Sequence, residues 1–312
     1  MTKFNNMIVV LTLTMGFLAM ANKASAEDPL RVTTEAETVS IYEGQHLLLR
    51  YRYDNVPFKA CVQQLFSPQG VNILRDAPAD HQHHHALMFA VAVDGVNFWE
   101  EQREPGRQVH HRFSEVRVGK SDDGPLAGFT EQLDWINPRS RDLLLKEDRT
   151  IEVRRVSGVD VTLLSWQSSL AVPPGKDAVV LSGSHYFGLG MRFVESMDAS
   201  GQFRNAGGKT GEVVRGDERL TLANWCAYTA EANGKPVTVA MFGHPDNVRH
   251  PTLWFTMTKP FAYLSATMNL HREPLKVTSE KPLILRYTVA LWDGPVADEQ
   301  ISRIYQQWVK SN

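Results

Sequence analysis

Short runs of β-branched and aromatic residues recur along the whole chain and predict β-strands. Turn sequences such as Asp94-Gly95 and Asn233-Gly234 separate these runs. An Asn-Gly pair between two strand-like runs is the strongest local sign of a β-hairpin. The segments predicted as strands are 39–42, 46–53, 86–93, 149–156, 159–167, 178–182, 185–193, 237–242, 254–257 and 283–292.

One segment near the C-terminus, residues 296–309, has the spacing of a helix instead. Ile301, Ile304, Tyr305 and Trp308 follow one another at i, i+3, i+4 and i+7, which gives a helix one apolar face. We expect Asp298 to be its N-cap. Many strands without helices between them argue against a parallel α/β sheet. The pattern predicts an all-β fold, a large antiparallel β-sandwich with a C-terminal helix, as a single domain over residues 27–312.

Residues 1–26 are predicted to be a signal peptide that is removed on export. Lys3 provides a positive start, residues 7–20 an apolar stretch, and Ala24-Ser25-Ala26 a small-residue cleavage site. The apolar stretch is shorter than the roughly 20 residues of a membrane span, although an uncleaved anchor helix is the alternative. We expect a periplasmic or secreted protein that begins at Glu27 and does not contact the membrane.

The balance of charges and the cysteines limit the other possibilities. Lys and Arg number 33 and Asp and Glu 35, a net charge of −2, which gives no electrostatic case for binding nucleic acid. Cys61 and Cys226 are the two cysteines of the chain. They could pair in an exported protein, but the sequence does not decide whether they meet.

The segment Asp80-His81-Gln82-His83-His84-His85 is the most unusual in the chain. Imidazole is a common metal ligand and a group that transfers protons near neutral pH. Two histidines from one loop, with a distant histidine or carboxylate, are a common metal site. We expect His81, His83 and His84 to bind a divalent metal (zinc, manganese or calcium), and His81 and His84 to be catalytic. The alternative is a solvated polar turn.

A second polar segment, residues 244–252, contains two prolines that stiffen its backbone. Asn247, Arg249 and His250 offer polar groups that can converge on a ligand. We expect this segment to meet the histidine segment in one site, with His250 among the catalytic residues. The alternative is a structural turn in which Asn247 caps backbone groups.

The segment 183–192 contains a Gly-x-Gly, but no helix or acidic ribose-binding residue follows it, so no nucleotide cofactor is expected. Glycine within a strand indicates a bulge or a close approach to the backbone. Glu100, Glu131 and Glu195 are candidate acid–base carboxylates, and no spacing rule selects a pair. The predicted substrate-binding residues are Arg75, Trp99, His185, Arg192, Asn247, Arg249 and Trp254.

These motifs together resemble a family of exported bacterial proteins known as methane oxygenase A-like. The matching segments are residues 66–70 with Arg75-Asp76, 80–84, 93–99, 188–192 and 244–254. The chain departs from that pattern at Gln82 (usually Pro), His85 (usually Arg) and Gly243 (usually Asp). The resemblance implies a mutarotase-like super-sandwich and a role in carbohydrate catabolism.

Three functions are therefore open. The first is an exported carbohydrate-active enzyme, a lyase, hydrolase or epimerase that acts on a sugar or an oxidised glycoside. The second is a sugar-binding β-sandwich module without catalysis. The third, suggested by the family name, is a metal-dependent oxygenase. In each case the expected partner is a small-molecule or glycan substrate.

Overall fold

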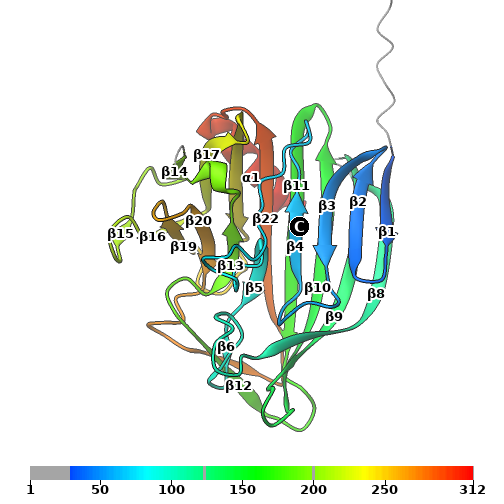
Figure 1. The fold of residues 1–312 in the computed structure, drawn as a ribbon, viewed down its shortest axis with the longest axis vertical. Helices are drawn as coiled ribbons and strands as arrows, with labels where there is room; N and C mark the ends of the chain where they lie inside the picture. The colour runs from blue at the N-terminus through cyan, green and yellow to red at the C-terminus, as the bar shows by residue number, and fades with distance from the viewer. Residues whose placement is uncertain (1–28, 122–123, 199–200, 312) are drawn as a thin grey trace, which may run out of the picture.

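The computed structural model of this chain describes residues 29–121, 124–198 and 201–311. Its strands form three sheets, two large and one small, and all the strand pairs within them are antiparallel (Figure 1). In order across the ten-stranded sheet, the strands are β1 (Leu30–Thr34), β2 (Thr38–Glu43), β3 (His46–Arg52), β4 (Cys61–Leu65), β5 (Leu87–Ala90), β13 (Gly188–Arg192), β20 (Tyr263–Thr267), β19 (Thr252–Met257), β16 (Arg219–Ala223) and β15 (Glu212–Val213).

The second large sheet has eight strands. In order, they are β14 (Gln202–Asn205), β17 (Trp225–Ala232), β18 (Lys235–Gly243), β22 (Leu283–Asp293), β11 (Val159–Ala171), β10 (Leu143–Val156), β9 (Gly124–Ile136) and β8 (Arg107–Ser121). The small sheet lies at one end of the long axis of the molecule (Figure 1). It consists of β21 (Leu275–Thr278), β12 (Ala178–Ser182), β6 (Ala92–Val93) and β7 (Val96–Asn97). A short 3-10 helix covers Glu195–Met197.

The two large sheets pack against each other around one apolar core that takes side chains from both. Alternation produces this arrangement, because successive side chains of a strand point to opposite faces. In β9, for example, Phe129, Leu133 and Trp135 are buried at every second or fourth position. The predicted antiparallel β-sandwich is confirmed.

The outer face of the eight-stranded sheet is covered by helix α1 (Asp298–Lys310). Ile301, Ile304, Tyr305 and Trp308 form its buried face, as their spacing predicts. The N-cap is Ala297 and not Asp298, which lies inside the first turn and accepts a hydrogen bond from Arg204 Nε at 2.6 Å. The predicted cap is therefore wrong by one residue, because Asp298 is held by a side chain of β14.

Two other details differ from the sequence prediction. The segment 185–193 is a strand only from Gly188, since Phe187 N donates to Ser184 O in a turn. The predicted segments omit about half of the described strands. The longest of those omitted are β8, a polar edge strand, and β9, which places Glu131 at a buried position. The Asn233-Gly234 hairpin is confirmed, with both residues at positive φ between β17 and β18.

The predictions for the chain ends and the cysteines have separate outcomes. The predicted signal peptide, residues 1–26, lies outside the described residues, and the single-domain prediction stays a prediction. Cys61 and Cys226 are buried free thiols in different sheets. Over the ranges that the structure describes, no helix is both long and apolar enough to cross a membrane.

Candidate functional site

The histidine segment is the tip of a loop that folds back on itself. Asp76 and His85 form an isolated antiparallel bridge, and Ala77 N donates to His84 O at 2.9 Å. Within the loop, His84 N donates to His81 O at 2.9 Å, which makes a tight turn. The turn replaces the alternation of an extended chain, so His83 and His84 point to the same side while His85 points away.

A pocket of about 320 Å³ lies against this loop, and we name it the histidine pocket. Its size falls within the range of small-molecule sites. The lining is mainly aromatic and histidine-rich, with a smaller number of charged groups. It includes His81, His83, His84, Trp99, Glu100, Tyr186, Arg215, Glu218, Phe255, Met257, Phe261 and Tyr263.

The imidazoles of His83 and His84 are neutral at neutral pH. Burial lowers the pKa of His83 to about 4, and the positive charge of Lys59 adds to the effect. Burial lowers the pKa of His84 to about 2. The nearby carboxylates of Glu101 and Glu100 act in the opposite direction on His83, since they favour its protonated form. A neutral imidazole has a free lone pair that can take a proton, and these carboxylates stabilise the imidazolium that results.

Two neutral side chains hold the carboxylate of Glu100 in the pocket. The Tyr186 hydroxyl donates a short hydrogen bond to it, and Asn97 Nδ2 donates at 3.0 Å. Burial, together with Glu100, raises the pKa of Tyr186, so its hydroxyl keeps the proton. The other lining carboxylate, Glu218, accepts two hydrogen bonds at 2.7 Å from Arg215. Glu218 is thus paired with a cation, whereas Glu100 is paired with neutral groups.

Behind the pocket a chain of buried charges holds its loops together. Asp76 Oδ1 and Glu101 Oε1 each lie 2.9 Å from a ring nitrogen of His85. Burial alone would lower the pKa of His85, but these two carboxylates raise it above its usual value. The buried Lys59 ammonium binds Glu101 and donates to the carbonyls of His83 and Trp99 at 3.3 and 3.0 Å. Lys59 therefore ties together two residues that line the pocket.

The rings of the predicted metal ligands His81, His83 and His84 lie together at the histidine pocket, with centroids 4.5–5.6 Å apart. In the described part of the chain, the group of ligand atoms within 4.8 Å of one another is Cys61, Asp76 and His85. This group fits a metal poorly, because His85 already hydrogen-bonds carboxylates through both nitrogens. Burial also raises the pKa of the Cys61 thiol, which opposes formation of the thiolate that would bind a metal. The divalent metal itself stays a prediction.

The predicted substrate-binding residues are spread around the molecule. Trp99 lines the histidine pocket, and His185 contacts Phe255 beside it. Arg192 is 1% exposed, with its guanidinium carbon 3.5 Å from the centroid of the Phe261 ring and Nη2 3.4 Å from Asp80. It thus supports the pocket wall from behind.

Two of these residues have structural contacts elsewhere. Arg75 forms an ion pair of 3.2 Å with the exposed Glu195. Trp254 is buried and donates to the carbonyl of Ala223 at 2.8 Å. Their roles in binding stay predictions.

The second polar segment does not meet the histidine segment. It ends where β19 begins, whereas Met257, at the other end of β19, lines the histidine pocket. Asn247 bonds both the N–H and the carbonyl of Arg286 at 2.7 Å, and Arg249 donates to the carbonyls of Met268 and Glu273. No residue of the second polar segment lines the histidine pocket, and the length of β19, about 17 Å, lies between the start of that strand and Met257. The alternative, in which Asn247 caps backbone groups, is what the structure shows.

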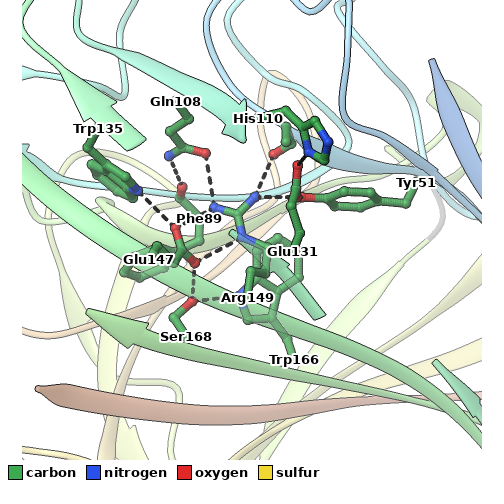
Figure 2. Close-up of polar contacts among 11 residues, drawn as sticks. Tyr51, Phe89, Gln108, His110, Glu131, Trp135, Glu147, Arg149, Trp166 and Ser168 are labelled. Carbon is green, nitrogen blue, oxygen red and sulfur yellow. Dashed lines mark hydrogen bonds and ion pairs between the residues drawn. The ribbon is translucent and has the colours of Figure 1, made fainter. Parts of the chain in front are cut away.

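The three candidate carboxylates also separate. Glu100 lines the histidine pocket, Glu195 lies on the surface, and Glu131 belongs to a buried network between the two large sheets. Figure 2 shows this network around Arg149. Arg149 binds Glu147, the Tyr51 hydroxyl, Gln108 and the carbonyl of Ala60, with donor–acceptor distances of 2.8–3.1 Å.

Sequence reasoning missed several residues of the pocket and of the charged chain behind it. Glu101, Arg215 and Glu218 stand in loops or turns without a motif around them. Lys59 precedes β4 and resembles any surface lysine in the sequence. For Tyr263 the sequence does contain a sign, which is the glycine at position 190 in the neighbouring strand β13. Gly190 has no side chain, so the Tyr263 hydroxyl can approach the backbone there. Gly190 thus serves a close approach, as glycine in a strand suggests.

Comparison with known families assigns the chain to one of them. A model described as "Family of unknown function (DUF6807)" matches residues 38–306. The chain belongs to the DUF6807 family. The predicted name, methane oxygenase A-like, is not supported. No curated protein matches the sequence of this DUF6807 chain.

Solved structures similar to the DUF6807 chain include two proteins with mutarotase in their descriptions. One is the mutarotase candidate YeaD of Salmonella typhimurium, with 12% identity, a TM-score of 0.38, and coverage of 85% of this chain and 91% of that one. The other is a galactose mutarotase related enzyme of Lactobacillus acidophilus, with 8% identity, a TM-score of 0.40, and coverage of 86% and 98%. Similarities at this level say nothing about the substrate of this chain.

Proposed function

We propose that this protein is a carbohydrate-active enzyme that moves a proton within a sugar bound in the histidine pocket. The observation that carries the proposal is the combination of an aromatic lining with neutral imidazoles and a fixed carboxylate in one pocket. Aromatic rings pack against the apolar C–H faces of a sugar, and a few placed polar groups orient its hydroxyls. Trp99, Phe255 and Phe261 supply the rings.

His83 is the proton acceptor in this proposal. Its imidazole is neutral and takes a proton from a carbon of the substrate; the proton given back goes to the opposite face of that carbon in an epimerisation, or to the leaving oxygen in an elimination. Glu100 stabilises the imidazolium that forms, since its negative charge favours protonated His83. Tyr186 and Asn97 hold Glu100 in place. In an epimerisation one proton is removed from a carbon and one is returned to it, and in an elimination the C–O bond breaks as the C=C bond forms, so neither step needs another reactant.

This arrangement favours an epimerase or a lyase over a glycoside hydrolase. Most hydrolases use two carboxylic groups, one of which must be protonated to act as the acid. Glu218, the second carboxylate of the pocket, is held by two hydrogen bonds from Arg215. Both oxygens of Glu218 are occupied by these two hydrogen bonds, which leaves no second free carboxyl group in the pocket beside Glu100.

Proton NMR of sugars in D₂O tests the proposal. The purified protein is mixed with aldoses, uronic acids and their oligosaccharides, and exchange, epimerisation or elimination is followed. His83→Gln and Glu100→Gln should each lower the rate about 10²–10⁴-fold, the usual contribution of a general acid or base. His111→Gln, on the exposed face of β8, is the matched control.

Two outcomes would contradict the proposal in different ways. Saccharide binding without any reaction, unchanged by His83→Gln, would indicate a binding module without catalysis. Absence of both binding and reaction across the panel would remove the carbohydrate role.

Export is part of the same proposal and rests on the sequence of residues 1–26. We propose that the protein acts in the periplasm or outside the cell. Mass spectrometry of the mature protein should find Glu27 as the first residue. An intact N-terminus in the membrane fraction would contradict export.

A further inference from the structure

A second, larger pocket of about 960 Å³ lies near the other end of β19. The hairpin of β15 and β16, the strands β19 and β20, and the loop that follows β20 all contribute to its lining. It includes Leu220, Leu222, Leu253, Thr267, Arg249 and Arg272. Nothing in the proposed proton transfer uses this pocket.

The two pockets share one face of the ten-stranded sheet. Along β19, Leu253 lines the second pocket, while Phe255 and Met257 line the histidine pocket. Residues two and four apart in a strand point to the same face. The pairing with β20 repeats the order, because Leu253 lies opposite Thr267 and Met257 opposite Tyr263. The pockets therefore follow each other along β19.

Two further elements border both pockets. In the β15–β16 hairpin, Glu212 and Leu220 line the second pocket, whereas Arg215 and Glu218 line the histidine pocket. On the other side, His185 contacts Phe255 of the histidine pocket.

His185 also contacts the loop after β20, which lines the second pocket. The His185 ring has its centroid 5.9 Å from that of His271. His271 stands between Asn269 and Arg272, which line the second pocket. Shared walls on both sides make the two pockets neighbouring parts of one surface.

We infer that the two pockets form one elongated groove and that the natural ligand is an oligosaccharide, an inference that rests on the proposed function. One terminal sugar enters the histidine pocket, where the proton is transferred. The following sugars lie along β19 in the second pocket. The distance from Leu253 to Met257 is about 13 Å along the strand, too long for one sugar ring to occupy both pockets.

The chemistry of the second pocket suits such a chain. Leu222 is 61% exposed and lies opposite Leu253 in the pairing of β16 with β19. An exposed leucine at a pocket offers an apolar surface to the C–H faces of sugars. Arg272 and Glu212, paired at 3.4 Å on the same wall, can donate to and accept from hydroxyls.

Calorimetric binding of sugars of increasing length tests the inference. The probes are the cello-, malto-, xylo- and galacturonic acid series, each from the monosaccharide to the tetrasaccharide. In the series that binds, affinity should rise with length and level off once both pockets are filled. Equal affinity of the monosaccharide and the tetrasaccharide would overturn the groove and leave the proposed function standing. No binding in any series would overturn both.

A surface substitution tests whether the extra affinity of the longer sugars comes from the second pocket. Leu222→Glu should lower tetrasaccharide affinity on the order of tenfold, the usual worth of a small apolar contact, with monosaccharide affinity unchanged. Val116→Glu is the matched control, since Val116 is 52% exposed on β8 of the other large sheet. A Leu222→Glu variant that folds normally and binds the tetrasaccharide like the parent would contradict the groove.

Discussion

The buried network around Arg149 and the histidine pocket use the same kinds of residue, yet their surroundings differ. Both contain histidine, glutamate and tyrosine. In the network, all three guanidinium nitrogens of Arg149 have acceptors, and Glu147 accepts from Arg149, Trp135 and Ser168 (Figure 2). In the pocket, the polar groups face a cavity.

The difference shows which polar residues stabilise the fold and which are available to a ligand. A buried polar network in which every group has a partner is rigid and gives a ligand nothing to bind. The pocket instead keeps neutral imidazoles and a carboxylate next to open volume. Residue type alone would rank Glu131, with His110 and Tyr51 beside it, as highly as Glu100.

The strongest test of this comparison removes the central cation of the network. Arg149→Met leaves Glu147 buried without its charge partner, so the free energy of unfolding should fall by about 3–5 kcal/mol. Urea denaturation measures the change. Arg139→Met is the control, because the Arg139–Glu104 pair is exposed and should contribute less than about 1 kcal/mol. A loss as small as that of the control would show that the network is not needed for stability.

A second test disturbs the wall of the histidine pocket without removing a polar group. In Gly190→Ala the new methyl group would overlap the hydroxyl of Tyr263. We expect a loss of about 1–3 kcal/mol in unfolding free energy, together with weaker sugar binding. Tyr263→Phe removes the overlapping oxygen, so the double variant should recover part of both losses. Additive losses in the double variant would contradict the close approach.

A third, smaller effect separates the second polar segment from the site. Asn247→Ala removes both hydrogen bonds to the backbone of Arg286 and should cost about 1 kcal/mol of stability. Monosaccharide affinity should stay unchanged, since Asn247 lies beyond β19 from the histidine pocket. Thermal unfolding and calorimetry measure the two quantities. A large loss of monosaccharide binding at unchanged stability would restore the idea of one compact site.

The last effect vanishes at neutral pH and grows in acid. The folded protein keeps His83 and His84 neutral down to pKa values of about 4 and 2, whereas the unfolded chain takes up protons near pH 6.5. The unfolded state then binds more protons, so stability falls as the pH drops below about 6.5. His85 acts in the opposite direction, because its pKa is raised in the folded state.

Replacing both pocket histidines isolates their part of the pH dependence. The variant His83→Gln/His84→Gln should lose less stability than the parent between pH 6.5 and 4, as measured by urea denaturation at each pH. His111→Gln should follow the parent. Identical curves for the double variant and the parent would show that the two imidazoles are not buried neutral.

Several features could be predicted from the sequence because they depend on local order. Strand-like runs separated by turns predicted about half of the described strands and the Asn233-Gly234 hairpin, and the spacing of Ile301 and Trp308 predicted the helix. The histidine segment was found because its composition is unusual. Strand β8 could not be predicted because, as a polar edge strand, it lacks the apolar alternation that marks a half-buried strand.

The sequence by itself determined the β-sandwich, the helix on its outer face and the place of the histidine loop, since each follows from residues close together in the chain. Tertiary structure decided which polar groups share a pocket. Glu100 and Tyr186 meet His83 only through pairing of distant strands, and Glu131 lies in the core for the same reason. Hydrogen-bond satisfaction and access to a cavity depend on contacts between strands far apart in sequence, and no local pattern contains them.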